Sequence, residues 1–332
     1  MADARFALAP TALIVAGPTC SGKSGLALAL AERFRGAVIN ADSMQVYADL
    51  HVLTARPDAQ DEARAPHRLY GVLDAACPGS VAWWREAALA EMTAAHAQGL
   101  MPIICGGTGM YLRALLGGLV EVPDPGDAAR DWARALVESE GSEGAHAMLL
   151  RDDPDTAQTL RPADSQRVAR ALEVLRGTGR GLTYWRSQPG LPPAPFRFVS
   201  VRLDPPRDTL RAAIAERFSR MMAMGAMEEV ERLMARGLSP ALPAMRAHGV
   251  PELGAALAGN LAMEDAVARA VIATGQYTRR QATWFNHHAL GAEQDCMISL
   301  QRYVDGTQFS KREFEKIATF IQSTIDESLH PS

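Results

Sequence analysis

The sequence predicts an α/β protein, a parallel sheet flanked by helices, with an inserted helical domain. Three observations indicate this fold. Short apolar segments alternate with helical patterns over the first 120 residues, and such alternation is typical of a parallel sheet with helices on both faces. A charged, helical stretch bounded by prolines follows. Strand character then returns near residue 196, which indicates that two separate parts of the chain build the sheet.

The individual elements follow from hydrophobic periodicity, which separates buried strands from amphipathic helices. Thr108 is suited to cap the helix that comes after the third strand. In chain order we expect strand 12–16, helix 23–33, strand 37–41, helix 81–98, strand 101–105 and helix 110–116, and then, beyond the insertion, strand 196–203 and helices 207–224 and 263–284.

Prolines and shifts of composition mark the domain boundaries. Pro123 and Pro125 mark one boundary, and a proline cluster at residues 189–195 marks another. Between them the pattern is helical and charged. We therefore predict a discontinuous α/β core of residues 1–122 and 196–291, a helical insertion of residues 123–195, and a peripheral C-terminal tail of residues 292–332.

Composition and charge restrict the class of protein. The chain has 332 residues, of which 48% are hydrophobic and 22% charged, a mix that supports a sizeable folded core. No apolar run approaches the roughly 18 residues of a membrane span. The net charge of −4 argues against coating nucleic acid through bulk charge, although a few local arginines suffice for phosphate contacts. The four cysteines show neither paired spacing nor a metal-ligand pattern, so we expect a protein of the reducing cytoplasm.

A phosphate-binding loop follows the first strand and opens the first helix. Its pattern, G-x-x-x-x-G-K-[ST], lets successive backbone N–H groups surround phosphate oxygens, and the helix N-terminus adds positive charge. Lys23, the only lysine among the first 310 residues, would place an ammonium on the terminal phosphate, and Ser24 would offer a hydroxyl to Mg²⁺. We expect a sheet like that of the P-loop NTPases and a di- or triphosphate ligand held by Gly17, Pro18, Thr19, Cys20, Ser21, Gly22, Lys23 and Ser24.

The residues at strand ends narrow the kind of phosphate enzyme. A GTPase needs an Asn-Lys-x-Asp motif, for which no lysine is available. A motor-type ATPase needs an apolar strand that ends in an acidic residue. The apolar strand 101–105 is followed instead by Gly106-Gly107-Thr108-Gly109. Asp42 is the strand-terminal acid near the loop, and it could bind Mg²⁺ through water, act as a general base, or cap a turn beside Ser43. Because the carboxyl ends of the strands line one crevice, Asp42, Thr108 and the phosphate loop should converge.

Six segments form a distinctive combination through their order and spacing. They are Gly-Pro-Thr-x-Ser-Gly-Lys-Ser, Asp42-Ser43-Met44-Gln45-Val46-Tyr47, Thr54-Ala55-Arg56-Pro57, Pro66-His67-Arg68-Leu69, Gly106-Gly107-Thr108-Gly109-Met110-Tyr111 and Gln166-Arg167-Val168-Ala169-Arg170-Ala171-Leu172-Glu173. This combination resembles the bacterial tRNA dimethylallyltransferase family. The resemblance extends from about residue 12 to residue 288.

The resemblance implies a transfer reaction in which the loop holds a diphosphate leaving group. The family moves a dimethylallyl group from dimethylallyl diphosphate to N6 of the adenosine immediately 3′ of the anticodon, in tRNAs that read codons beginning with U. The implied partners are dimethylallyl diphosphate and the tRNA anticodon stem-loop, and the implied cofactor is Mg²⁺ at Ser24, with Asp42 through water. An exocyclic amine is a weak nucleophile, so a base is needed. The implied catalytic residues are Asp42 as the base, Lys23, Thr108 and Arg217.

The resemblance also implies contacts with tRNA. The target base must leave its stack to meet a buried electrophile, and single-stranded loops are where RNA is usually read by sequence. The family often has Gly-Tyr-Arg-Gln where this chain has Gly249-Val250-Pro251-Glu252, a departure that removes a tyrosine and an arginine. The implied tRNA-binding positions are Asp42, Ser43, Met44, Gln45, Thr108, Arg130, Gln166, Arg167, Val168, Ala169, Arg170, Arg246, Ala247, His248, Gly249, Val250 and Pro251.

Two alternatives stay open beside this interpretation. A small-molecule kinase of the phosphate-loop class could use the same loop, with the helical insertion as a lid, and would be indifferent to tRNA. The second is an RNA-binding protein without catalytic activity. The presence of intact Lys23, Ser24 and Asp42 argues against it. We expect a monomer, since a wide tRNA-binding face leaves little reason for a partner subunit.

Overall fold

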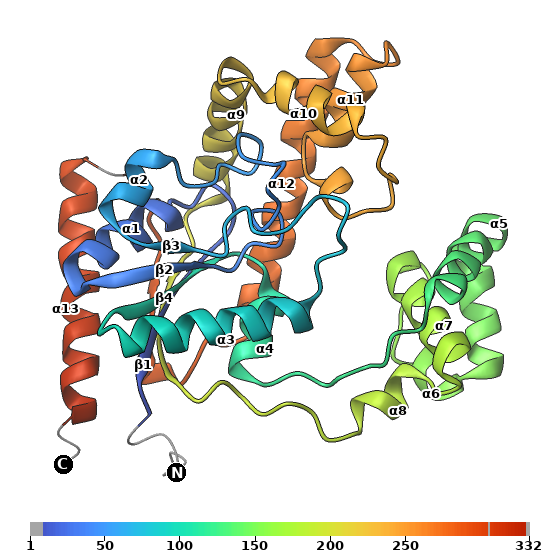
Figure 1. Cartoon of the computed structure of the whole chain (residues 1–332), viewed down its shortest axis with the longest axis horizontal. Helices are drawn as coiled ribbons and strands as arrows, with labels where there is room; N and C mark the ends of the chain where they lie inside the picture. Colours follow the sequence, from blue (N-terminus) through green and yellow to red (C-terminus); the bar gives the residue numbers. More distant parts are fainter. Residues whose placement is uncertain (1–8, 305, 330–332) are drawn as a thin grey trace. The chain divides into compact units, whose positions relative to one another are not determined.

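The larger of two compact units is built around a six-stranded parallel sheet (Figure 1). This computed structural model describes residues 9–304 and 306–329. The strands lie in the order β3–β2–β4–β1–β5–β6, which confirms the predicted α/β class with a P-loop NTPase-like sheet. They are β1 (Thr11–Ala16), β2 (Gly36–Asn40), β3 (His67–Arg68), β4 (Met101–Gly106), β5 (Arg197–Leu203) and β6 (Cys296–Ser299).

Each helix that periodicity predicted in this unit is present, with ends that agree to within three residues. Among the described residues, no helix is long and apolar enough to cross a membrane. The helices are α1 (Lys23–Phe34), α2 (Ala59–Arg64), α3 (Val81–Ala97), α4 (Gly109–Leu116), α9 (Arg207–Ala223), α10 (Ala226–Ala235), α11 (Val250–Leu257), α12 (Met263–His287) and α13 (Gln308–Leu329). Of these, we did not predict α2, α10, α11 and α13.

Both faces of the sheet are buried, because successive side chains of a strand point to opposite faces. On one face Ile14 packs in a cluster with Trp84 of α3. On the other face Val15 packs in a separate cluster with Leu26 of α1 and Ile321 of α13. Burial on both sides explains why the central strands β1 and β4 are nearly continuous apolar runs in the sequence rather than alternating ones.

The segment after Ala292 is not a peripheral tail. Residues Cys296–Ser299 form β6, which pairs with β5, and α13 buries Ile317 and Ile321 fully. The composition was misleading because α13 is amphipathic, so its many polar residues lie on the face that is turned away from the core. The end of the predicted tail, residues 330–332, lies outside the described residues.

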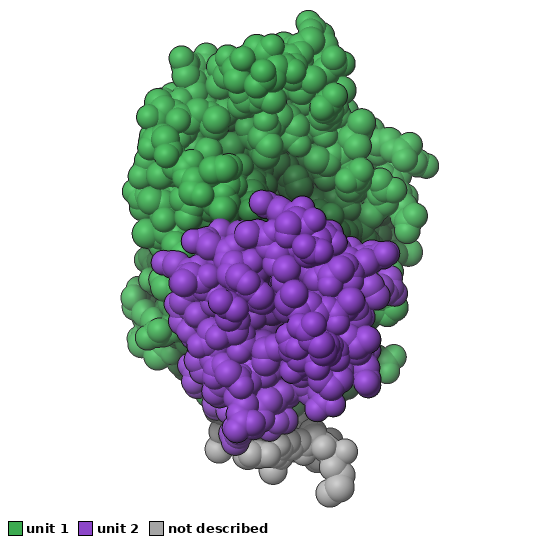
Figure 2. Space-filling view, turned by 90° about the vertical axis from the view of Figure 1, so that its right-hand side faces the viewer, with its two compact units in different colours: residues 1–116, 194–332 green, residues 117–193 purple. Residues whose placement is uncertain are grey.

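Residues 117–193 form the second compact unit, where the sequence placed an insertion at 123–195 (Figure 2). This unit has its own apolar core, which includes Ala133, Leu149 and Leu172. Gly141 interrupts its longest helix, where the backbone has a φ of 70°. The helices are α5 (Asp127–Asp152), α6 (Pro154–Ala157), α7 (Ser165–Thr178) and α8 (Leu182–Arg186).

Candidate active site

The phosphate loop connects β1 to α1, as its pattern requires. Cys20 and Gly22 have positive φ angles of 67° and 91°, and the N–H of Ser21 donates to the carbonyl oxygen of Pro18 at 3.2 Å. A Cβ atom on Gly22 would lie 2.0 Å from the carbonyl oxygen of Tyr303, so only glycine fits. Lys23, which is 9% exposed, is the first residue of α1.

Gln281 of α12 joins the phosphate loop to the end of β4. Its Oε1 accepts from the N–H of Thr19 at 2.9 Å and from the hydroxyl of Thr19 at 3.2 Å. Its Nε2 donates to the carbonyl oxygen of Gly107 at 3.0 Å. The side chain is buried, so these bonds are shielded from water. The sequence placed this residue on the expected helix 263–284, and its contact with Thr19 spans 262 positions.

Asp42 lies just beyond β2, in a turn that fixes its carboxylate. The N–H of Met44 donates to Oδ1 of Asp42 at 2.9 Å, and the N–H of Asp42 donates to Oδ1 of Asn40 at 2.8 Å. Asn40 is fully buried, and its Nδ2 donates to the carbonyl oxygens of Asp42 and Leu69 at 3.0 Å each. The predicted role of Asp42 as a turn residue and a role in chemistry are therefore compatible.

Thr108 lies beside this turn, as the topology of the sheet predicted. Its Oγ1 accepts from the N–H of Ser43 at 3.0 Å, and its own N–H donates to the carbonyl oxygen of Ala41 at 3.2 Å. The close approach depends on Gly106, where a Cβ atom would lie 2.1 Å from the same carbonyl oxygen. The hydroxyl of Thr108 therefore bonds to the Asp42 turn, while its carbonyl oxygen accepts from the N–H of Leu112 at 3.3 Å, which places Thr108 at the start of α4 as we expected.

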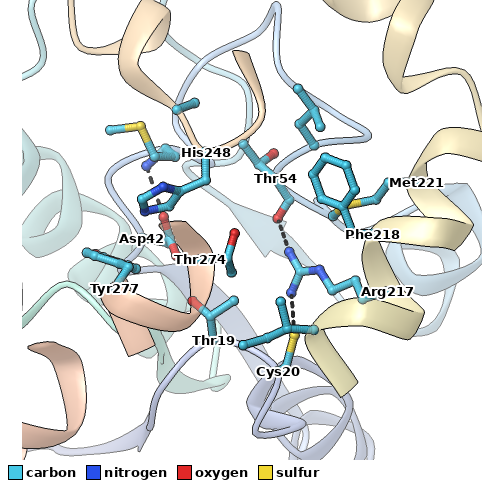
Figure 3. Close-up of a pocket in the computed structure, with 14 residues that line it drawn as sticks. Thr19, Cys20, Asp42, Thr54, Arg217, Phe218, Met221, His248, Thr274 and Tyr277 are labelled. Carbon is cyan, nitrogen blue, oxygen red and sulfur yellow. Dashed lines mark hydrogen bonds between the residues drawn. The ribbon is translucent and has the colours of Figure 1, made fainter. Parts of the chain in front are cut away.

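One pocket contains the ends of these elements. The pocket is partly open to solvent. Figure 3 shows Asp42, His248 and Tyr277 at one side, with Arg217 and Phe218 at the other. The lining residues are Thr19, Cys20, Asp42, Met44, Leu53, Thr54, Ile214, Arg217, Phe218, Met221, Ala247, His248, Thr274 and Tyr277.

Arg217 of α9 points into the pocket toward the phosphate loop (Figure 3). Its Nη2 donates to the carbonyl oxygen of Thr54 at 3.2 Å, and its Nη1 lies 3.9 Å from Sγ of Cys20. The loop that contains Thr54 is itself held by Glu229 of α10, a buried carboxylate that the sequence did not single out. Glu229 accepts from the N–H groups of residues 51–53 at 2.7, 2.7 and 2.9 Å.

Two rings line the Asp42 side of the pocket. His248 and Tyr277 have ring centroids 5.0 Å apart. Burial lowers the pKa of His248, so its imidazole is neutral near pH 7. Burial also raises the pKa of Tyr277 to about 12, so its phenol stays protonated. The sequence had not identified Tyr277, whose position on α12 gives it no motif of its own.

The comparisons with known proteins agree with this geometry. The family model for IPP transferase matches residues 45–288, and the model for isopentenyl transferase matches residues 10–76. The chain is 65% identical to a tRNA dimethylallyltransferase of Gluconobacter oxydans (strain 621H), over 97% of each chain. It is 57% identical to another of Gluconacetobacter diazotrophicus, over 95% of each.

The chain belongs to the tRNA dimethylallyltransferase family. Solved structures of the family have the same fold. The tRNA isopentenylpyrophosphate transferase of Bacillus halodurans aligns with a TM-score of 0.66 at 28% identity, over 96% of this chain and 99% of that one. A eukaryotic dimethylallyltransferase acting on tRNA aligns with a TM-score of 0.74 at 25% identity, over 95% and 80%. This membership favours transfer to tRNA over the kinase and the inactive RNA-binding protein.

The family resemblance implied several tRNA-binding residues in the larger unit, and these residues fall into buried and exposed groups. Met44, Ala247 and His248 line the pocket. Gln45 donates through Nε2 to the carbonyl oxygens of Thr54 and Ala55, and so supports the pocket wall. Arg246 and Pro251 are exposed, whereas Gly249 and Val250 are buried. The buried pair therefore has a packing role in the free protein, and the exposed pair stays available for RNA.

In the unit of residues 117–193 the implied contacts divide in the same way. Gln166 and Arg167 of α7 are exposed, whereas the side chain of Val168 is fully buried in the core of this unit, so it packs there. Ala169 is half-buried. The guanidinium of Arg170 pairs with Glu173 at 2.6 Å, and that of Arg130 pairs with Asp124 and Asp127. Both arginines would have to exchange these partners for RNA phosphates.

Proposed function

We propose that this chain transfers the dimethylallyl group of dimethylallyl diphosphate to N6 of the adenosine immediately 3′ of the anticodon, in tRNAs that read codons beginning with U. The products are N6-isopentenyladenosine and diphosphate. One observation carries the proposal: the phosphate loop and the carboxylate of Asp42 line the same pocket, which also has an apolar wall.

The phosphate loop is suited to the leaving group. Its backbone N–H groups and the ammonium of Lys23 would hold the diphosphate, and the guanidinium of Arg217 faces the same end of the pocket. The hydroxyl of Ser21 is buried and has no hydrogen-bond partner within the described part of the chain. A buried hydroxyl of this kind is satisfied when a phosphate oxygen binds beside it. These groups would stabilise the negative charge that grows as the diphosphate departs.

The apolar wall of the pocket is suited to the prenyl chain. Leu53, Ile214, Phe218 and Met221 supply its side chains. An allylic carbon becomes cation-like as its bond to the diphosphate breaks, and water would capture it if it could enter. An apolar wall excludes that water and leaves the adenine amine as the nucleophile.

The Asp42 side is suited to the acceptor. A flipped adenine that enters beside Tyr277 and His248 would bring its N6 amine toward the carboxylate of Asp42. N6 forms the new bond to the allylic carbon, that carbon loses its bond to the diphosphate oxygen, and Asp42 takes the N6 proton. A positioned base contributes typically ~10²–10⁴-fold in rate.

The residues present also fit Mg²⁺. Ser24 and Asp42 are hard oxygen donors, which this ion prefers. The described residues contain no cluster of three or more His, Cys, Asp or Glu side chains that could hold a metal alone, so most ligands would come from the diphosphate and water. When bound, the ion would neutralise charge on the diphosphate.

A single incubation tests the proposal. Purified protein, Mg²⁺ and an unmodified tRNA with adenosine 3′ of its anticodon are mixed with dimethylallyl diphosphate in one tube and with ATP in another. Mass spectrometry of the digested RNA should detect dimethylallyl-adenosine in the first tube alone. ATP consumption without that product would favour the kinase, and tRNA binding without product would favour the inactive RNA-binding protein.

A further inference from the structure

The segment between β6 and α13 lies against the phosphate loop, although it is far from that loop in the sequence. Nε of Arg302 donates to the carbonyl oxygen of Cys20 at 2.9 Å. The N–H of Tyr303 donates to the carbonyl oxygen of Ser21 at 3.0 Å. The ring of Tyr303 would be 3.4 Å from a Cβ atom on Gly25, so it lies against the first turn of α1.

These two bonds fix the direction of two consecutive peptide groups. In a trans peptide the C=O and the N–H point in opposite directions. Because the carbonyl groups of Cys20 and Ser21 are held by the C-terminal segment, the N–H groups of Ser21 and Gly22 are fixed in the opposite direction, and that of Ser21 donates to the carbonyl oxygen of Pro18 and so closes the turn of the phosphate loop. The backbone N–H groups of such a turn form the concave site that binds an anion. The same bond to Arg302 stabilises the positive φ of 67° at Cys20, which a residue with a side chain rarely adopts.

The segment is anchored well enough to act as a support. The hydroxyl of Ser299 donates to Glu313 of α13 at 2.7 Å, and the N–H of Val304 donates to the hydroxyl of Ser310 at 2.9 Å. Both anchors tie the segment to α13, whose Ile317 is fully buried in the core. Arg302 therefore extends from a fixed backbone to the loop.

We propose that Arg302 is a positioning residue for the diphosphate, which acts through the carbonyl oxygen of Cys20. The proposal rests on the function proposed above. The matched family model ends at residue 288, so this contribution comes from a part of the chain outside that match. Loss of the bond would free the Cys20–Ser21 peptide group to rotate and would weaken the binding of any ligand whose phosphate lies in the loop.

Inorganic diphosphate is the probe that tests this role, with binding measured by calorimetry in the presence of Mg²⁺. Arg302→Met keeps the length of the side chain but removes its donors, and should weaken binding about tenfold, the effect of one charge-assisted hydrogen bond. Arg302→Lys restores a donor and should recover part of the affinity. Arg312→Ala, which changes an exposed arginine of the same C-terminal region, should bind as the parent does.

Kinetics separate positioning from a general loss of structure. Arg302→Met should raise the KM for dimethylallyl diphosphate while the KM for tRNA and the melting temperature stay close to those of the parent. Unchanged diphosphate binding, or an equal loss toward both substrates with a lower melting temperature, would overturn the proposal. A chain that shows Arg302-dependent diphosphate binding yet makes no dimethylallyl-adenosine would contradict the proposed reaction alone.

Discussion

Asp42 is held in place by a buried network that begins two residues earlier. The side chain of Asn40 bonds to both the N–H and the carbonyl oxygen of Asp42. The indole Nε1 of Trp84 in turn donates to the carbonyl oxygen of Asn40 at 2.7 Å. Trp84 is itself fully buried and stacks on Tyr111, with ring centroids 4.2 Å apart. Trp84 therefore packs in the core and also positions the candidate base, because its indole N–H donates at the end of β2.

Replacement of Asp42 tests the base directly. Asp42→Asn keeps an oxygen for the bond from the N–H of Met44 but removes the proton acceptor, and Asp42→Ala removes both. We expect both variants to bind tRNA within a few-fold of the parent and to lose about 10²–10⁴-fold in the rate of transfer. Single-turnover kinetics with saturating substrates measure that rate. A variant with parental turnover would exclude Asp42 as the base.

His248 makes stability depend on pH in a defined direction. Its pKa lies below the ordinary value of 6.5, first because of burial and secondly because of Arg280, while Glu252 and Asp42 oppose the shift. The unfolded chain therefore takes up a proton before the folded chain does, and stability falls as the pH drops below about 6.5. Urea denaturation should show that His248→Gln loses part of this dependence. Parallel pH profiles for parent and variant would contradict the assignment.

At the scale of elements, α10 controls a loop that lies 178 positions away. The carboxylate of Glu229 accepts three backbone N–H bonds from residues 51–53, and the next residue, Thr54, offers its carbonyl oxygen to Arg217 and Gln45. Residues 51–54 of the loop are thus fixed by Glu229 at one end and by Arg217 and Gln45 at the other. The guanidinium of Arg217 is therefore oriented, through this loop, by the carboxylate of Glu229, which does not line the pocket.

Glu229→Ala should leave those three N–H groups without a buried acceptor. We expect a loss of about 3 kcal/mol or more in the free energy of unfolding, and a higher KM for dimethylallyl diphosphate because Arg217 loses its alignment. Denaturant titration and steady-state kinetics measure the two effects. The exposed neighbour Glu228→Ala should change stability by less than about 0.5 kcal/mol. Equal effects of the two substitutions would show that the carboxylate of Glu229 does not hold the loop.

These long-range contacts mark the limit of what the sequence could predict. The strands β1, β2, β4 and β5 were predictable because each is rich in apolar residues and ends at a recognisable loop or acid. The two-residue β3 exists only through its pairing with β2, so no local pattern reveals it. Gln281, Glu229 and Arg302 contact residues 262, 176–178 and 282 positions away, and side chains of these types are common on exposed helices. Motifs therefore predicted which residues form the candidate site, whereas the residues that support them required the fold.

At the scale of the whole molecule, residues 117–193 interrupt the core without dividing it. The carbonyl oxygen of Leu115 accepts from the N–H of Ala194 at 2.8 Å, so the chain leaves and re-enters the larger unit at neighbouring points. Leu119 and Leu191 exchange backbone hydrogen bonds at 3.1 and 2.7 Å at the base of the insertion. An insertion with adjacent ends and a core of its own adds binding surface at little cost to the folding of its host.

Replacement of residues 117–193 by a short Gly-Ser linker should therefore leave the larger unit folded. Because the phosphate loop, Arg217 and Arg302 all lie outside the excised residues, inorganic diphosphate should bind with roughly the parental affinity. Binding of tRNA should weaken at least about tenfold at moderate salt, since Arg167 and its neighbours on α7 are removed. Calorimetry and gel-shift titration measure the two affinities. Transfer to tRNA at the parental rate by the excised chain would show that the inserted unit has no part in RNA recognition, and loss of diphosphate binding would show that the two units do not act independently.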